Sequence, residues 1–532
     1  MHRLPRLPAA PCPAAALTWA TALPQAAALT QAAALTWAAA LLLAASVVAA
    51  PSIGRAEDDL DDLMGGFDDD FDVSIIEEEE ETAPDWLMAV PGGDWAWENV
   101  DVSGSLSSAA VWSYLGRSVA DSEGSGGRTD QDGLSRLDLR GRLQIDVQLP
   151  FDWQARAEIL GWYDFSYQIR GRRDFNAAVL DVYEWQVDSG EAYLSGPISE
   201  NFDLTLGRKV VNWGRSDTFR IVDVVNPLEN QEPGLVDIED LRRPRTMVKL
   251  DYQRGPWSGQ LLVIPEHRYD RNPPPGSDFI PDPFTSVPGG LGGGSPIDDR
   301  DDFTGTPGFA AKFDGRFSGW DFSLYGAYID ETTRTVDTLR FSVPPPALVF
   351  DVKQEANRFG MVGAAANVTR GAFLFKIEMG GFFGLRTIRF DVTPGPAGPL
   401  LNQERDRLDT LVGVEWYGPD QLTVAVEIVN RHLFDHPGGP TGVIELTPAD
   451  RFETAIRVTR PFLRERLDVT LLGTILGERA QDGGTFRASA DYELTDSLKV
   501  EGGWLVFFQG PRFGPGAFDS NDRVYGELKY SF

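Results

Sequence analysis

The closing stretch of the 532-residue chain, residues 522–532, reads DRVYGELKYSF. Val, Gly, Leu, Tyr and Phe at the even positions from 524 to 532 alternate with Arg, Tyr, Glu, Lys and Ser. Because successive side chains of a strand point to opposite faces, this period of two predicts a strand with one apolar face and one face in water. An edge strand of a soluble sheet would alternate in the same way, so the pattern alone leaves both settings open.

The last residues favour a membrane setting. Phe532 ends the stretch, and Tyr530 lies two positions earlier on the same face. In this respect the stretch resembles the closing strand of bacterial outer-membrane barrels, whose final Phe is part of the assembly signal. The resemblance implies that Tyr530 and Phe532 form this signal, and that the barrel assembly machinery is a partner.

The same alternation recurs along the chain from residue 99 onward. Residues 133–149, GLSRLDLRGRLQIDVQL, place Leu, Ile and Val on one face and Arg, Asp and Gln on the other. Similar stretches lie near residues 99–113, 133–149, 153–167, 188–197, 202–213, 244–254, 258–266, 306–316, 319–329, 357–368, 371–381, 409–418, 421–431, 452–460, 463–475, 484–493, 497–508 and 522–532. We therefore predict an all-β fold, a transmembrane antiparallel β-barrel of about 18 strands (16 being possible) over residues 99–532.

The connections between these stretches alternate in length. Tight turns, such as those at 418–420 and 495–497, alternate with long connections rich in Gly, Pro and Asp. Barrels of the bacterial outer membrane have short periplasmic turns and longer extracellular loops. The expected location is thus the bacterial outer membrane, with lipid and lipopolysaccharide as surroundings and the long loops outside the cell.

The first 56 residues are expected to be a signal peptide. They begin with Arg3 and Arg6, continue through LTWAAALLLAASVVAA at 35–50 and contain no acidic residue. Cleavage is expected after Ala50 or Ala56, with Ala56 favoured. The single cysteine, Cys12, lies in this leader, so we expect no disulfide or thiolate chemistry in the mature protein.

The formal net charge of −32 argues against nucleic-acid binding. Residues 57–85 contribute 15 carboxylates and no Lys or Arg. We expect residues 57–98 to be an acidic, largely disordered periplasmic tail. The alternative is a short docking motif for a periplasmic partner, in which apolar residues such as Leu60 and Phe67 make the contact.

Residues 207–250 carry the most distinctive motifs, GRKVVNWGRS at 207–216, Asn226-Pro227 and RRP at 242–244. Here the chain resembles an uncharacterised proteobacterial outer-membrane family, a porin-like domain of unknown function with a Gly-Arg-x-x-Val-x-Trp-Gly-x-Ser stretch, an Asn-Pro element and an Arg-Arg-Pro element. The resemblance covers about 45 residues. Members are often encoded near lipid-type efflux pumps, which implies handling of hydrophobic or aromatic compounds.

Charged residues of this loop and of the wall are the candidate site. A loop with both signs of charge can fold into the lumen and narrow it, or pack on the rim through its own ion pairs. In the first case opposed charges would orient polar solutes and anions. The candidate constriction residues are Arg136, Arg140, Arg142, Arg156, Arg215, Asp217, Arg220, Asp223, Arg242 and Arg243.

The expected function is a porin-like channel for passive or facilitated passage of small solutes. One alternative is an outer-membrane transporter for hydrophobic compounds or lipids that acts with an efflux or lipid-transport system. Another is a non-conducting structural barrel. We expect no enzyme, cofactor or metal site, because no motif places a nucleophile beside His432 or His436.

Overall fold

The computed structural model describes residues 98–115, 118–120, 128–130, 132–236, 241–274, 276–279, 302–333, 335–340, 351–355, 357–391, 401–436, 443–445, 448–508, 510 and 521–532. The predicted signal peptide and all but the last residue of the predicted acidic tail lie outside these residues. Among the described residues, no helix combines the length and apolar character needed to cross a membrane.

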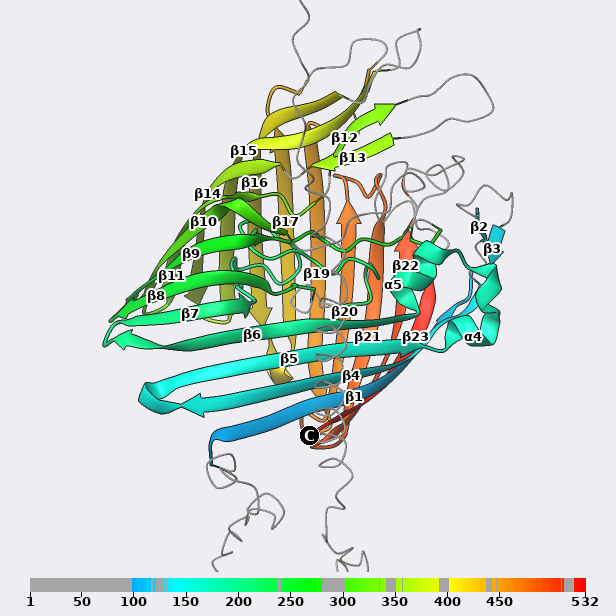
Figure 1. Ribbon diagram of the computed structural model, residues 1–532, viewed down its shortest axis with the longest axis horizontal. Coiled ribbons are helices and arrows are strands. Elements are labelled where there is room, and N and C mark those ends of the chain that lie inside the picture. Colours follow the sequence, from blue (N-terminus) through cyan, green and yellow to red (C-terminus); the bar gives the residue numbers. More distant parts are fainter. Residues whose placement is uncertain are drawn as a thin grey trace, which may run out of the picture. The chain divides into compact units, whose positions relative to one another are not determined.

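Eighteen antiparallel strands form one closed barrel, as the alternation in the sequence predicted. Each strand is hydrogen-bonded to the next one along the wall (Figure 1). The strands are β1 (Val100–Ser113), β4 (Gly133–Leu149), β5 (Trp153–Asp164), β6 (Trp185–Ser199), β7 (Phe202–Lys209), β8 (Arg245–Arg254), β9 (Trp257–His267), β10 (Asp302–Phe317), β11 (Trp320–Asp330), β14 (Arg358–Arg370), β15 (Phe373–Asp391), β16 (Leu401–Tyr417), β17 (Thr423–Leu433), β19 (Asp450–Phe462), β20 (Leu467–Leu476), β21 (Gly484–Thr495), β22 (Leu498–Phe508) and β23 (Arg523–Ser531).

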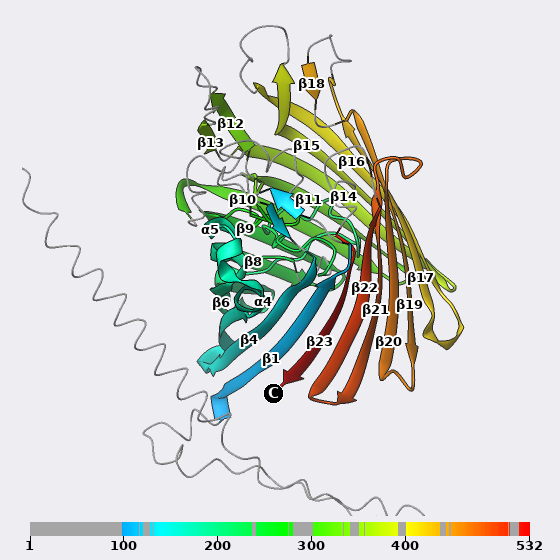
Figure 2. The same cartoon turned by 90° about the vertical axis from the view of Figure 1, so that its right-hand side faces the viewer.

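Strand β1 closes the barrel because it pairs on one side with β4 and on the other with β23. The two end strands lie side by side in Figure 2. Ser105 faces Ser531, and Gly104 exchanges backbone hydrogen bonds of 2.9 and 3.1 Å with Phe532. The sheet therefore has no open edge along this seam, which is the requirement for a sheet in lipid.

Smaller elements lie in the connections. The short helices are η2 (Pro150–Asp152), α4 (Ser166–Arg170), η3 (Arg172–Asp174), α5 (Ala177–Tyr183) and η4 (Pro419–Gln421). Strands β2 (Ser118–Ala120) and β3 (Arg128–Asp130) form one hairpin, β12 (Thr335–Arg340) and β13 (Asp351–Glu355) form another, and β18 (Val443–Glu445) pairs with β15. The sequence pattern predicted tight turns at 150–152 and 418–420, where η2 and η4 lie, but none of the other elements.

Two predicted strands end earlier than expected. The stretch 153–167 leaves the sheet after Asp164, whose carboxylate accepts the backbone N–H of Ser166 at 2.8 Å and so begins a helical turn. The stretch 202–213 leaves the sheet after Lys209. There the backbone N–H of Val210 donates to a wall carboxylate at 2.9 Å and that of Val211 to the Asn226 side chain at 2.8 Å.

The outer face of the wall is apolar. At least 44% of the surface is exposed for each of Leu106, Leu139, Val187 and Leu261. Such exposure of large apolar side chains is unusual for a soluble sheet but suits contact with lipid. Near the short turns, Trp257, Phe313, Phe317, Trp320 and Phe322 form a cluster of ring contacts at 4.5–6.5 Å. Aromatic residues of this kind mark the membrane–water interface of such barrels.

Candidate functional site

The described part of the connection between β7 and β8, residues 210–236 and 241–244, enters the barrel and is called the lumen loop here (Figure 1). Its first part, residues 210–228, is the anchored segment. The backbone N–H groups of Arg215 and Ser216 both donate to Glu378 of β15, the second at 2.8 Å. The Ser216 hydroxyl donates to Glu427 of β17 at 2.6 Å. Two wall carboxylates thus fix the loop inside the barrel.

The anchored segment also builds a dry core inside the barrel. Trp213, Ile221, Val222 and Val225 are at most 4% exposed. They pack on inward-facing side chains of β8 to β17, namely Met247, Leu262, Ile264, Ala310, Tyr325, Ile329, Phe359, Met361, Ala365, Phe382, Leu411 and Val429. The Trp213 indole also donates to Gln260 at 3.1 Å. This half of the lumen is therefore filled by packed side chains.

Most charged side chains of the lumen loop form ion pairs that hold the loop in place. Arg215 pairs with Asp321 at 2.5 Å and Asp217 with Lys376 at 2.7 Å, and both partners belong to the wall. Asp223 is shared within the loop by Arg220 at 3.1 Å and Arg242 at 2.8 Å. These five candidate residues thus hold the loop in place.

The rest of the loop projects from the anchored segment, and its two ends are hydrogen-bonded to each other. Glu229 N–H donates to the Leu241 carbonyl and Arg243 N–H to the Pro227 carbonyl, both at 2.8 Å. Residues 229–236 and 241, the described part of this stretch, are called the tip segment here. The tip segment borders a cavity of about 540 Å³ that is also lined by β1, β4, β5, β6 and β23, by α4 and α5, and by Arg271 and residues 277–279. Nine cationic and nine acidic side chains line this cavity, so its formal charge is balanced.

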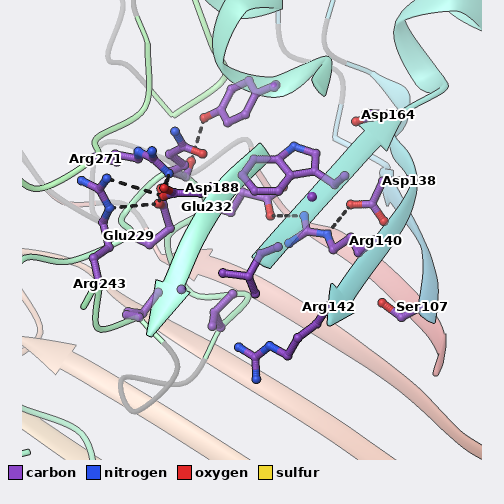
Figure 3. Close-up of a pocket in the computed structure, with 18 of the residues that line it drawn as sticks. Ser107, Asp138, Arg140, Arg142, Asp164, Asp188, Glu229, Glu232, Arg243 and Arg271 are labelled. Atoms are coloured by element: carbon purple, nitrogen blue, oxygen red, sulfur yellow. Dashed lines mark hydrogen bonds and ion pairs between the residues drawn. The ribbon is translucent and has the colours of Figure 1, made fainter. Parts of the chain in front are cut away.

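Arg136 and Arg140 of β4 both line the cavity, and Figure 3 shows Arg140 beside Asp138. Asp138, whose side chain is 0% exposed, lies between them. Its Oδ2 is 3.3 Å from Arg136 Nε and 2.6 Å from Arg140 Nε. The terminal nitrogens of both arginines face Glu232 of the tip segment, which contacts Arg136 directly and lies 3.5 Å from Arg140 Nη2. Burial alone would raise the pKa of Glu232, but the two arginines outweigh it and lower that pKa.

Arg142 and Arg156 lie further along the same wall. Arg142 pairs with Glu158 at 3.0 Å, and its side chain is 56% exposed, the most open of the lumen arginines predicted from the sequence. Arg156 pairs with Asp146 at 2.7 Å and lies over the Tyr193 ring at 5.9 Å. Both residues line the cavity, but neither has an ion pair with the lumen loop among the described residues.

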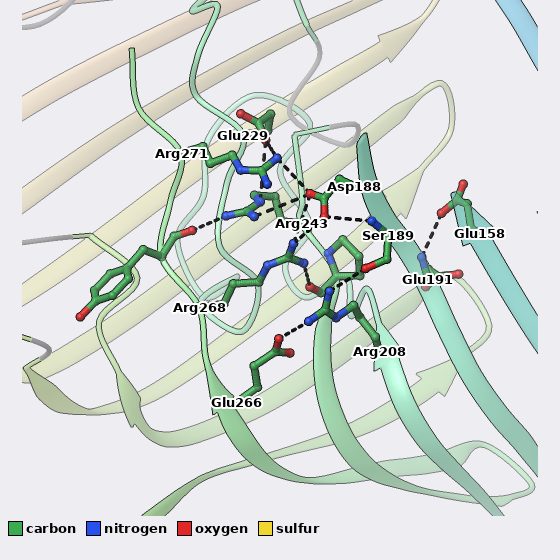
Figure 4. Close-up of polar contacts among 12 residues, drawn as sticks. Glu158, Asp188, Ser189, Glu191, Arg208, Glu229, Arg243, Glu266, Arg268 and Arg271 are labelled. Atoms are coloured by element: carbon green, nitrogen blue, oxygen red, sulfur yellow. Dashed lines mark hydrogen bonds and ion pairs between the residues drawn. The ribbon is translucent and has the colours of Figure 1, made fainter. Parts of the chain in front are cut away.

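A second arginine cluster lies where the tip segment rejoins the wall (Figure 4). Arg268, Arg271 and Arg243 converge on Asp188 of β6, at 3.2, 2.9 and 3.8 Å. Glu229 also pairs with Arg271, at 3.2 Å. Burial and the neighbouring Arg271 and Arg268 lower the pKa of Arg243 to about 10, which leaves it charged at neutral pH. Burial raises the pKa of Glu229, because the attraction of the arginines only partly compensates.

The alternation in the sequence identified the arginines but not most of their partners. Glu232, Asp188, Glu229, Arg268, Arg271, Glu378 and Glu427 were not among the candidates. Asp138 had been placed only on the inner face of its strand. A signal existed for Glu378 and Glu427, because each is a carboxylate in the inward phase of its strand. Glu232 had no such signal, because its position depends on the path of the loop.

The closed sheet, its apolar exterior and its aromatic cluster define a bacterial outer-membrane β-barrel. The chain belongs to the family described as "Protein of unknown function (DUF1302)", whose model matches residues 14–532. No curated protein gives a significant match. The match confirms that the chain belongs to a family of unknown function, as the resemblance implied. The motif signature of that family remains a prediction.

Several solved outer-membrane channels are similar to the chain. OccAB2 of Acinetobacter baumannii is 10% identical, with a TM-score of 0.45 over 82% of this chain and 98% of that one. OpdK of Pseudomonas aeruginosa is 11% identical, with a TM-score of 0.43 over 82% and 99%. OmpF of Salmonella typhi, solved with daunomycin, is 10% identical, with a TM-score of 0.39 over 82% and 98%. The likeness is one of fold alone.

Proposed function

We propose that the protein is an outer-membrane channel through which small solutes pass by diffusion or after weak binding, and that the tip segment sets the width of the passage. The observation that carries this proposal is the ion-pair contact of Glu232 with Arg136 and Arg140, across the lumen from the anchors of the same loop. A loop fastened to both sides of a barrel narrows the space between them. Charges in such a narrow space act strongly on a passing ion, because little water screens them.

Excision of the tip segment gives a sharp test. Because the ends of the segment are already bonded to each other, replacing residues 230–240 with two glycines leaves the anchored segment in place. Single-channel conductance in planar bilayers should then rise. Arg140→Gln and Arg142→Gln should shift the reversal potential toward cation selectivity. A conducting barrel in which neither quantity changes would contradict the proposal, and a native barrel that does not conduct would favour a structural role.

The apolar inner wall from β8 to β17 favours a second candidate, a transporter for hydrophobic compounds that acts with an efflux or lipid-transport system. Its inward side chains form the kind of patch that such a substrate would need. The anchored segment covers this patch, so the second candidate requires that segment to leave the wall. Labelling of a single cysteine at Val222 by a thiol reagent only during transport would support it.

A further inference from the structure

Asp138 gives the arginine pair of the cavity the form of a binding site. Its carboxylate accepts a hydrogen bond from Arg140 Nε at 2.6 Å and lies 3.3 Å from Arg136 Nε as an ion pair, and its Oδ1 also accepts the Ala109 N–H at 3.3 Å. Held in this way, the two guanidinium groups keep their terminal nitrogens on the cavity side, where Glu232 lies. Guanidinium groups so fixed lose little freedom when they bind a carboxylate.

The carboxylate of Glu232 can move away from the two arginines more easily than that of Asp138. Asp138 belongs to a barrel strand and is fully buried, whereas the Glu232 side chain is 20% exposed and borders the cavity. Rotation about the side-chain bonds of Glu232 would move its carboxylate off the arginines. The anchored segment does not have to move. Without Glu232 the two arginines and Asp138 carry a net charge of about +1, which attracts an anion.

The surroundings of the pair suit an anion that also has an apolar part. The Trp162 ring lies 5.4 Å from the Arg140 guanidinium carbon, and Leu160 follows Trp162 on the same face of β5. Both line the cavity, whose volume of about 540 Å³ lies within the range usual for small-molecule sites. Trp162 and Leu160 offer an apolar surface beside the charged groups.

A continuation of the site leads along the strands away from the tip segment. Arg140 faces Ser107 of β1, and Ser107 faces Lys529 of β23, so that two cations flank a small residue in one row across the wall. Arg142 follows Arg140 on the same face and is half exposed (Figure 3). An anion released from the pair therefore meets further cationic side chains along the same wall.

We propose that Arg136 and Arg140 bind the carboxylate of small organic anions with an apolar or aromatic body, and that Glu232 occupies this site when no solute is bound. The inference rests on the proposed channel function and names its solute class. Glu232 acts as a tethered competitor, since its attachment to the loop keeps it at high effective concentration beside the pair. Binding of solute replaces one carboxylate by another without a net change in the pairing of the arginines.

Isothermal titration calorimetry on the folded barrel in nanodiscs tests the exchange with phenylacetate as the probe and phenylacetamide as its uncharged analogue. In Glu232→Gln the affinity for phenylacetate should rise about tenfold or more, because the competitor has lost its charge. Glu232→Asp, with a shorter carboxylate, should lie between native and Gln. Arg140→Gln in the Glu232→Gln background should return the affinity to the native level or below. Phenylacetamide should bind weakly to all variants.

The matched control is Asp203→Asn, which removes one acidic charge at β7, outside the lining of the cavity. It should leave the phenylacetate affinity unchanged. Slower migration of the heated than of the unheated protein on gels verifies that each variant is folded. Equal affinities in native and Glu232→Gln protein, or equal binding of acid and amide, would overturn the inference.

The test separates this inference from the channel function. A barrel that conducts but binds phenylacetate with no dependence on Glu232 retains the proposed function and loses the solute class. A barrel that shows the predicted order of phenylacetate affinities but no conductance would keep the binding site and contradict the channel function. Acetate as a third probe measures the contribution of Trp162 and Leu160, and it should bind more weakly than phenylacetate in Glu232→Gln.

Discussion

The Ser216 hydroxyl donates a hydrogen bond of 2.6 Å to Glu427, joining residues 211 positions apart. A hydrogen bond to a charged group contributes roughly 1.5–3 kcal/mol. We expect Ser216→Ala to raise the deuterium exchange rate of amides in residues 210–228, with little further effect from adding Glu427→Gln. Additive effects of the two substitutions would show that the pair is not coupled.

Trp213 should be the largest single contributor to loop docking. Its side chain is 1% exposed and contacts the Tyr325 ring at 5.4 Å. Removing a buried Trp side chain costs about 3–5 kcal/mol, so Trp213→Ala should release the anchored segment and increase single-channel current noise. Trp185→Ala, at a Trp that is 59% exposed, is the control and should leave the noise unchanged. A quiet Trp213→Ala channel would mean that the ion pairs alone hold the loop.

Acidification should act on the tip segment in two steps. The pKa of Glu229 is raised by burial, so this residue becomes protonated above the usual value for Glu of about 4.3 and loses its charge pairing with Arg271 first. The pKa of Glu232 is lowered, so its stabilising contact with Arg136 persists through that pH and is lost only below it. Conductance measured against pH should show both steps. Glu229→Gln should remove the upper one and Glu232→Gln the lower one.

The seam between the first and last strands should be sensitive to bulk at Gly104. A Cβ atom there would lie 2.5 Å from the Arg142 carbonyl oxygen and 2.7 Å from Cζ of Phe532. Gly104→Val should therefore reduce the yield of folded barrel, read from the gel shift on heating. Gly326, which has no atom within 4 Å of a built Cβ, is the matched control. Normal folding of Gly104→Val would show that the seam can shift to accept a side chain.

The strands were predictable because each one carries its own two-residue alternation. Strand ends and the loop path were not, since they depend on distant partners. Lys209 ends β7 because side chains of Glu191 and Asn226 take the next two backbone N–H groups. The same limit applies to the site. Arg136 and Arg140 could be found from their phase in β4, whereas their partner Glu232, 96 positions from Arg136, is set by the fold of the whole loop.

The dry core against β8 to β17 makes the two halves of the barrel mechanically unequal. Close-packed side chains resist compression, so the wall from β8 to β17 is braced from within by Trp213, Ile221 and Val222. The wall from β1 to β6 is faced instead by the cavity and by ion pairs, which yield more easily. Lateral pressure from the bilayer should therefore deform the second half more than the first. The arginine pair Arg136 and Arg140 thus lies in the more deformable half of the barrel.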